Sequence, residues 1–134
     1  MRCDVLTIGT ELLLGQIVDT NSTWIGEAFA TSGVDTYDQR KVGDNVDRIV
    51  TALRHQLRDA DAVLCCGGLG PTQDDVTREA FAELLGVPLE RRDELVAQIR
   101  SFFEARGRVM TDSNLRQADV PAGAAAIPNP VGTA

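Results

Sequence analysis

Strand-like segments alternate with helical patterns along most of this sequence. The apolar runs CDVLTI at 3–8 and DAVLCC at 61–66 predict buried strands, and the polar, partly alternating VDTYDQRKV at 34–42 predicts an edge strand. Amphipathic patterns predict helices after these segments, over 21–31, 46–58 and 75–85. Such an alternation builds a mainly parallel sheet with helices on both faces. We therefore expect a three-layer α/β/α fold with strand order 2-1-3.

The helical patterns also predict helix ends and buried faces. Asn21 is the expected N-cap of the first helix and Gly33 its end, and Asp44 or Asn45 should cap the second. A helix over 92–106, a short helix near 112–118 and an irregular or hairpin-like tail should follow. The side chains expected to face the core are Trp24, Ile25, Ala28 and Phe29, then Ile49, Val50, Leu53 and Leu57, then Val76, Ala80, Phe81, Leu84 and Leu85.

Composition narrows the class of protein. The 134 residues suit one domain, 1–134, and no apolar run approaches the roughly 20 residues of a membrane helix. Thirteen Lys and Arg against 20 Asp and Glu give a net charge of −7, which disfavours nucleic-acid binding. Three cysteines without CxxC spacing and a single histidine disfavour disulfides and zinc. Without a signal-peptide pattern, we expect a cytoplasmic protein that binds neither nucleic acid nor membrane.

A parallel sheet binds ligands beyond the carboxyl ends of its strands. The loops expected at that edge are 9–21, 43–45 and 67–75. The third loop carries Gly67, Gly68 and Gly70, whose N–H groups can approach a phosphate closely, followed by the positive end of a helix. Thr72 adds a hydroxyl group. The loop has neither the Walker pattern nor GxGxxG, so it indicates an anion site without defining its class.

Aspartates stand beside this anion site, where their charge should repel a phosphate. One interpretation is that Asp44, Asp74 and Asp75 only cap the helices that follow them. The other is that a divalent cation lies between carboxylates and phosphate, because Mg²⁺ is commonly bound by one or two carboxylates together with phosphate oxygens. The residues leave both interpretations open. The second makes Asp44, Asp74 and Asp75 ligands of Mg²⁺ or another divalent metal.

The first loop, GTELLLGQIVDTN, is long for a connection between a strand and a helix. Its polar side chains suit a sugar, a ring or a metal-bound water. These are Thr10, Glu11, Asp19, Thr20 and Asn21. The leucines at 12–14 indicate core or a subunit interface rather than ligand contacts. Arg106, Arg108 and Arg116 have the planar fork that suits phosphate, but we expect such arginines to be solvated surface residues.

Four motifs together resemble the N-terminal domain of CinA-type competence/damage-inducible proteins. They are GTELLLGQIVDTN, VGDN, CGGLGPTQDDVT and FFEARGRVMTDSNLRQADVPAGAAAIPNPVGTA. That domain is similar in fold to the molybdopterin-binding domains of the MoaB, Mog and MoeA proteins. The resemblance runs from residue 3 to the last residue, and RGRxMTxxNxRQA and NPVGTA are its most specific parts. Family members continue past NPVGTA into further sheet, so the resemblance implies a fold truncated at its C-terminus.

The resemblance also implies a site and an activity. Asp44 and Asp75 align with the acidic pair on which Mog-type adenylyltransferases depend, which makes them the candidate catalytic residues. For the CinA branch, the resemblance implies divalent-metal-dependent hydrolysis of ADP-ribose to AMP and ribose 5-phosphate by a homo-oligomer, a dimer or a trimer. The ligand contacts that it implies are Gly9, Thr10, Asp19 and Asn21, and the loop 67–72 with Gly67, Gly68, Gly70, Pro71 and Thr72.

Two other functions remain open. Molybdopterin binding or adenylyl transfer in molybdenum cofactor biosynthesis agrees with the wider fold family, although the CinA-specific C-terminal motif disfavours it. A non-catalytic nucleotide-binding or assembly module is the alternative from a different class. The expected partner is a phosphorylated small molecule of nucleotide or pterin type.

Overall fold

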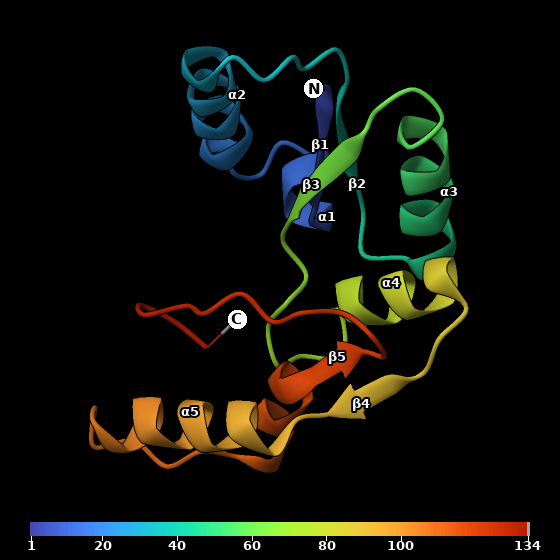
Figure 1. Ribbon diagram of the computed structural model, residues 1–134. Coiled ribbons are helices and arrows are strands. Elements are labelled where there is room, and N and C mark those ends of the chain that lie inside the picture. The colour runs from blue at the N-terminus through green and yellow to red at the C-terminus, as the bar shows by residue number, and fades with distance from the viewer. Residues whose placement is uncertain (134) are drawn as a thin grey trace. The chain divides into compact units, whose positions relative to one another are not determined.

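The computed structural model describes residues 1–133, which fold into two compact units, Met1–Gly68 and Leu69–Ala134 (Figure 1). The first unit contains a three-stranded sheet, and the second contains a two-stranded sheet with helices. None of the helices in the described residues is both long and apolar enough to cross a bilayer.

The first unit is built on three parallel strands, as the sequence predicts. β1 (Cys3–Ile8) lies between β2 (Gln39–Val42) and β3 (Ala62–Cys66), which gives the order 2-1-3. Val5 pairs with Gln39 on one side and with Leu64 on the other. Three helices belong to this unit: α1 (Thr10–Leu13), α2 (Thr20–Ser32) and α3 (Val46–Gln56). Figure 1 shows α2 and α3 on opposite sides of the strands, so the predicted layers are present here.

Burial in the first unit corrects three expectations. Ile25, Ile49, Val50 and Leu53 are buried as predicted, but Trp24 is 69% exposed. Since successive helical residues are rotated by about 100°, the burial of Ile25 turns Trp24 away from the sheet. Leu57 is exposed because α3 ends before it. β3 is only half buried, with Leu64 41% exposed, because β3 is an edge strand rather than an interior one.

The second unit combines helices with a short two-stranded antiparallel sheet. Its elements are α4 (Thr77–Leu85), β4 (Leu89–Arg91), α5 (Asp93–Glu104), the 3₁₀ helix η1 (Asp112–Ala118) and β5 (Asp119–Pro121). β4, which the sequence did not predict, pairs antiparallel with β5 across α5 and η1. The predicted tail is irregular over the described residues that follow β5. Leu85 was expected to be buried but is exposed, because it is the last residue of α4 before the chain turns at Gly86.

Asp4 fastens β1 to the segment that leads into β2. It is fully buried, and its carboxylate accepts hydrogen bonds from the Arg2 guanidinium and from the N–H groups of Tyr37 and Asp38. Burial acts to raise the pKa of Asp4, but these hydrogen bonds outweigh it, and the pKa lies below its ordinary value. A charged Asp4 therefore stabilises the first unit.

We expect Asp4→Ala to lower the free energy of unfolding by about 2 to 3 kcal/mol at pH 7, because two backbone N–H groups lose their acceptor. Asp38→Ala is the matched control, since that carboxylate pairs with Arg40 near the surface and should cost less than about 1 kcal/mol. Urea titrations of both variants make the comparison, and equal losses would contradict the role of Asp4.

The same contacts predict how stability depends on pH. A carboxyl group whose pKa is lowered by folding contributes its full stabilisation above the ordinary pKa of about 3.9 and loses it as the pH falls through the lowered value. Wild-type protein should therefore lose stability as the pH falls below about 4, and Asp4→Ala should lose less over the same interval. Urea midpoints measured between neutral and acidic pH test this difference.

Candidate functional site

In the first unit, the loops after β1 and β2 are joined by a threonine–aspartate contact. The Thr10 N–H and hydroxyl each donate to Oδ2 of Asp44 at 2.9 Å, and the Asp44 N–H donates to the Thr10 hydroxyl at 3.1 Å. The cap of α3 is Asn45, which accepts from the Arg48 N–H. The interpretation of Asp44 as a helix cap is therefore wrong. Its carboxylate instead connects two loops that the sheet topology was expected to bring together.

The third loop begins where its backbone passes close to the end of β1. Gly67 has φ 101°, and a Cβ atom there would fall onto the carbonyl oxygen of Ile8 at the end of β1. Gly68 also has positive φ, at 65°. The glycines that the sequence assigned to phosphate binding are thus required by the chain's own geometry. This requirement is compatible with a ligand contact, which stays a prediction.

Asp19 caps α2, so the predicted cap Asn21 is wrong by two residues. One oxygen, Oδ1, accepts from the Ser22 N–H, while the buried Oδ2 has no hydrogen-bond partner among the described residues. The Lys41 ammonium lies 3.7 Å from Oδ2. Burial acts to raise the pKa of Asp19, but Ser22, the Thr7 hydroxyl and Lys41 together lower it, so the group is a carboxylate at neutral pH. The Lys41 ammonium is the charged partner of this buried oxygen.

The remaining predicted residues of the first unit flank these contacts. Gly9 is buried and precedes α1, and a Cβ atom there would lie 2.7 Å from Oε1 of Glu11. Glu11 and Asn21 are exposed, in the first turns of α1 and α2. Both side chains are therefore accessible to a ligand.

In the second unit, the loop before α4 repeats the threonine–aspartate contact. The Thr72 N–H and hydroxyl donate to Oδ2 of Asp75, at 2.9 and 2.6 Å, and the Asp75 N–H donates back to the Thr72 carbonyl at 3.2 Å. A Cβ atom on Gly70 would lie 2.6 Å from Oδ2 of Asp75, so Gly70 makes room for this carboxylate. Pro71 is half-buried beside it, and Asp74 is exposed in the turn.

The start of α4 shows whether Asp74 or Asp75 caps this helix. α4 begins after Val76 and has no side-chain cap, so neither Asp74 nor Asp75 caps it, contrary to the first interpretation. Burial acts to raise the pKa of Asp75, but the hydrogen bonds from Thr72 and Gly70 and the charge of Arg78 lower it. Asp75 is therefore a carboxylate whose Oδ2 is held by Thr72.

Two arginines that the sequence did not assign to the site hold this loop. Arg78 is 6% exposed and donates to the carbonyls of Leu69 and Gly70, at 2.6 Å each. Arg116 donates to the Thr72 carbonyl at 2.5 Å and to the Asp75 carbonyl at 3.2 Å. The expectation that Arg116 is a solvated surface residue is wrong, because its guanidinium is directed at the loop. Arg106, in contrast, stacks on the Phe102 ring.

The Cys65 thiol is not suited to act as a nucleophile at neutral pH. Burial raises the pKa of this thiol to about 12, so almost none of it is thiolate. Cys66 lies beside the Thr7 hydroxyl, with Sγ 3.8 Å from Oγ1. Carboxylates and backbone N–H groups are therefore the functional groups of the candidate site.

The carboxylates fit a divalent metal in one particular mode of binding. Within neither unit do three His, Cys, Asp or Glu side chains of the described residues gather into a metal site. Mg²⁺ does not need such a cage, because it usually keeps several waters and takes one or two carboxylates and substrate phosphate oxygens. Asp44 and Asp75, each held through Oδ2 by a threonine, fit this mode of binding.

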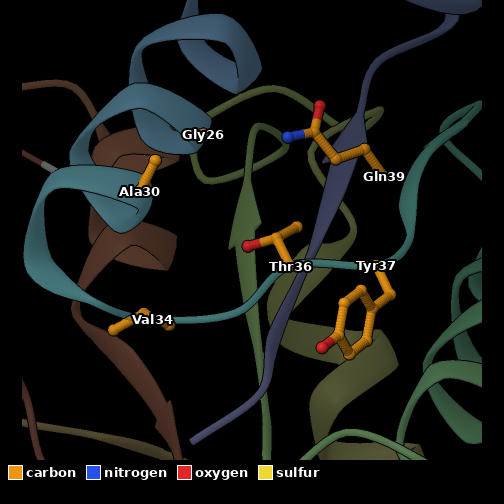
Figure 2. A pocket seen from close by; sticks show the side chains of 6 residues that line it. All are labelled: Gly26, Ala30, Val34, Thr36, Tyr37 and Gln39. Atoms are coloured by element: carbon orange, nitrogen blue, oxygen red, sulfur yellow. The ribbon is translucent and has the colours of Figure 1, made fainter.

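A hollow of about 300 Å³ in the first unit lies away from these loops. Figure 2 shows its lining residues, which come from α2, from the segment that leads into β2 and from the first residue of β2. They are Gly26, Ala30, Val34, Thr36, Tyr37 and Gln39. None of them was a predicted site residue, and they lie near the start of β2 rather than beyond the carboxyl ends of the strands.

Comparison with solved structures places the fold. MoaB of Thermus thermophilus, a molybdopterin biosynthesis enzyme, has a TM-score of 0.60 and 23% identity, with 88% of this chain and 70% of that chain covered. CinA of Thermoplasma acidophilum, a protein described as having unknown function, has a TM-score of 0.88 and 36% identity. This second match covers 98% of the present chain and 77% of the Thermoplasma chain. The fold is of the MoaB/Mog-like, molybdopterin-binding type.

Sequence comparison defines the family. Residues 4–134 match the family described as "Probable molybdopterin binding domain". A relative from Symbiobacterium thermophilum, named as a competence-damage inducible protein, is 47% identical over 134 residues, which are 100% of this chain and 32% of the relative. A CinA-like protein of Dictyoglomus thermophilum is 44% identical, with 100% and 33% covered. The chain belongs to the molybdopterin-binding domain family, in its CinA branch, and spans about a third of the length of these curated relatives.

The close approach at Gly67 yields a direct test. Gly67→Ala should lower the free energy of unfolding by about 3 kcal/mol or more, because backbone strain is added to a collision with the Ile8 carbonyl. Gly86→Ala is the control, since φ is 67° there and nothing lies within 4 Å of the added Cβ, so only strain of about 1 to 2 kcal/mol applies. Similar losses in denaturant titrations of the two variants would show that the approach to β1 is unimportant.

Proposed function

We propose that the chain binds a nucleotide pyrophosphate with a divalent metal, and that it hydrolyses ADP-ribose to AMP and ribose 5-phosphate. The observation that carries the proposal is the repeated threonine–aspartate contact. In each unit one carboxylate, Asp44 or Asp75, is fixed through Oδ2 by a threonine, and its Oδ1 would bind a cation. A carboxylate beside a glycine loop suits a phosphorylated ligand only when a cation offsets its charge.

Each group of predicted site residues would have a separate role in binding or hydrolysis. Asp44 in the first unit and Asp75 in the second would each offer a carboxylate to a cation, with exposed Asp74 close to Asp75 in sequence, and a cation would supply polarisation of the pyrophosphate. Backbone N–H groups of the 67–72 loop would stabilise charge that develops on phosphate oxygens. Asp19 and exposed Asn21 would contact a ligand hydroxyl, such as that of a ribose. Hydrolysis adds one water, forms its bond to phosphorus and breaks one P–O bond of the pyrophosphate.

A second candidate is favoured by the family match. Because residues 4–134 match a molybdopterin-binding family, the same site would suit a phosphorylated pterin or its adenylylated form. A non-catalytic nucleotide-binding or assembly role is the third. Incubation with ADP-ribose and Mg²⁺ separates them: AMP release supports hydrolysis, whereas binding without turnover supports one of the other two.

Asp75→Asn tests the metal-ligand role. Asparagine retains an oxygen that can accept from Thr72, so the melting temperature should change little, but the loss of charge facing the cation should abolish metal-dependent AMP release. Asp47→Asn is the control, because Asp47 is an exposed carboxylate in the first turn of α3. Retention of near-wild-type hydrolysis by Asp75→Asn at limiting Mg²⁺ would contradict the role of Asp75 as a metal ligand.

We also propose that the chain forms a homo-oligomer, a dimer or a trimer. Apolar side chains are exposed along the segment after β1: Leu13 is 47%, Leu14 65%, Ile17 52% and Val18 83% exposed. An apolar surface of this kind is typical of a protein contact. Light scattering should give a multiple of the monomer mass, and Leu14→Glu should lower it. A monomer mass for the wild-type protein at micromolar concentration would refute the proposal.

A further inference from the structure

We propose that Arg116 is a positioning residue that holds the Asp75 carboxylate in its working orientation. Arg116 lies in η1, 41 residues from Asp75 along the chain, yet its guanidinium donates to the carbonyls at both ends of the turn 72–75. The inference rests on the proposed function, because it assigns Arg116 a role in the site that Asp75 forms.

The turn 72–75 depends on such support. Its own hydrogen bonds join only Thr72 and Asp75, and both Gln73 and Asp74 between them are exposed. An exposed four-residue turn fixed by two residues alone opens readily. One planar guanidinium that binds both end carbonyls restrains the distance between them, and with it the contact between the Thr72 hydroxyl and the Asp75 carboxylate.

Two sets of contacts hold Arg116 in place, one at its guanidinium and one in the backbone turn that carries it. Oε1 of Glu79, on α4, accepts from Nη2 of Arg116 at 2.6 Å. On η1, the buried Asn114 accepts from the Thr111 N–H and hydroxyl and donates to Gln117, which anchors the helical turn that carries Arg116. The segment TDSNLRQA thus acquires a physical role: it builds a rigid base for one side chain directed at the loop.

Arg116 also determines which way the peptides of the turn face. In a trans peptide, the C=O and the following N–H point in opposite directions, and no cis bond occurs among the described residues. Because the carbonyls of Thr72 and Asp75 face the guanidinium, the N–H groups of Gln73 and Val76 point away from it. Two N–H groups presented on the side opposite a bound guanidinium suit an oxyanion. Arg116 therefore organises the carboxylate and the N–H groups together.

Arg116→Gln tests the inference, with Arg91→Gln as the matched control. Like Arg116, Arg91 makes an ion pair in the second unit, with both carboxylate oxygens of Asp119, but it binds no loop carbonyl among the described residues. We expect Arg116→Gln to lower the ¹⁵N order parameters of residues 73–75 from about 0.85 towards 0.6, and Arg91→Gln to leave them unchanged. The Mg²⁺ concentration for half-maximal AMP release should rise about tenfold or more only in Arg116→Gln.

Two further variants keep the test decisive. Glu79→Gln loosens the guanidinium without removing it and should shift the same order parameters less, which covers the case in which Arg116→Gln fails to fold. Arg116→Lys should restore less than half of the lost Mg²⁺ affinity, since one ammonium group does not reproduce the planar fork. Full restoration by lysine would contradict the fork geometry.

The readouts separate the inference from the proposed function. Order parameters report on the turn whether or not the protein hydrolyses ADP-ribose. Unchanged order parameters at 73–75 in both Arg116→Gln and Glu79→Gln would overturn the positioning role. Failure of the wild-type protein to release AMP would overturn the proposed hydrolysis while the order parameters still decide the role of Arg116.

Discussion

A single carboxylate oxygen of Asp75 accepts two hydrogen bonds from Thr72, and the loop before α4 is arranged around that contact. Gly70 lacks a side chain where one would displace the carboxylate, and Arg78 and Arg116 take the loop carbonyls. Buried or half-buried carbonyls need donors, and a guanidinium supplies several in one plane. The 69–75 loop is therefore a preorganised element whose acidic group is held in place before any ligand arrives.

The first unit contains a similar threonine–aspartate contact between different elements. There the Thr10 N–H and hydroxyl hold Oδ2 of Asp44, so that the ends of β1 and β2 are joined at the carboxyl edge of the sheet. Each unit thus presents one oriented negative charge beside polar loop residues, an arrangement suited to a cation that carries a phosphorylated ligand.

Local patterns in the sequence predicted much of this fold, and long-range contacts explain what they missed. The alternation of strands and helices gave the order 2-1-3, and Gly33 and Gly86 end their helices with positive φ, as helix-stop glycines do. Trp24 was misplaced because helical periodicity does not fix which face meets the sheet. Arg116 carried no local signal, since its partner Thr72 lies 44 residues away. The roles of Asp44 and Asp75 as caps failed because a threonine competes for each carboxylate.

The central claim is that a divalent cation reconciles these carboxylates with a phosphorylated ligand. Isothermal titration of the wild-type protein with ADP-ribose, once with Mg²⁺ and once with the chelator EDTA, tests it most directly. The account predicts measurable binding with Mg²⁺ and a loss of at least about tenfold in affinity with EDTA, because uncompensated like charges oppose binding by about 1.4 kcal/mol or more. Equal affinity under the two conditions would contradict it.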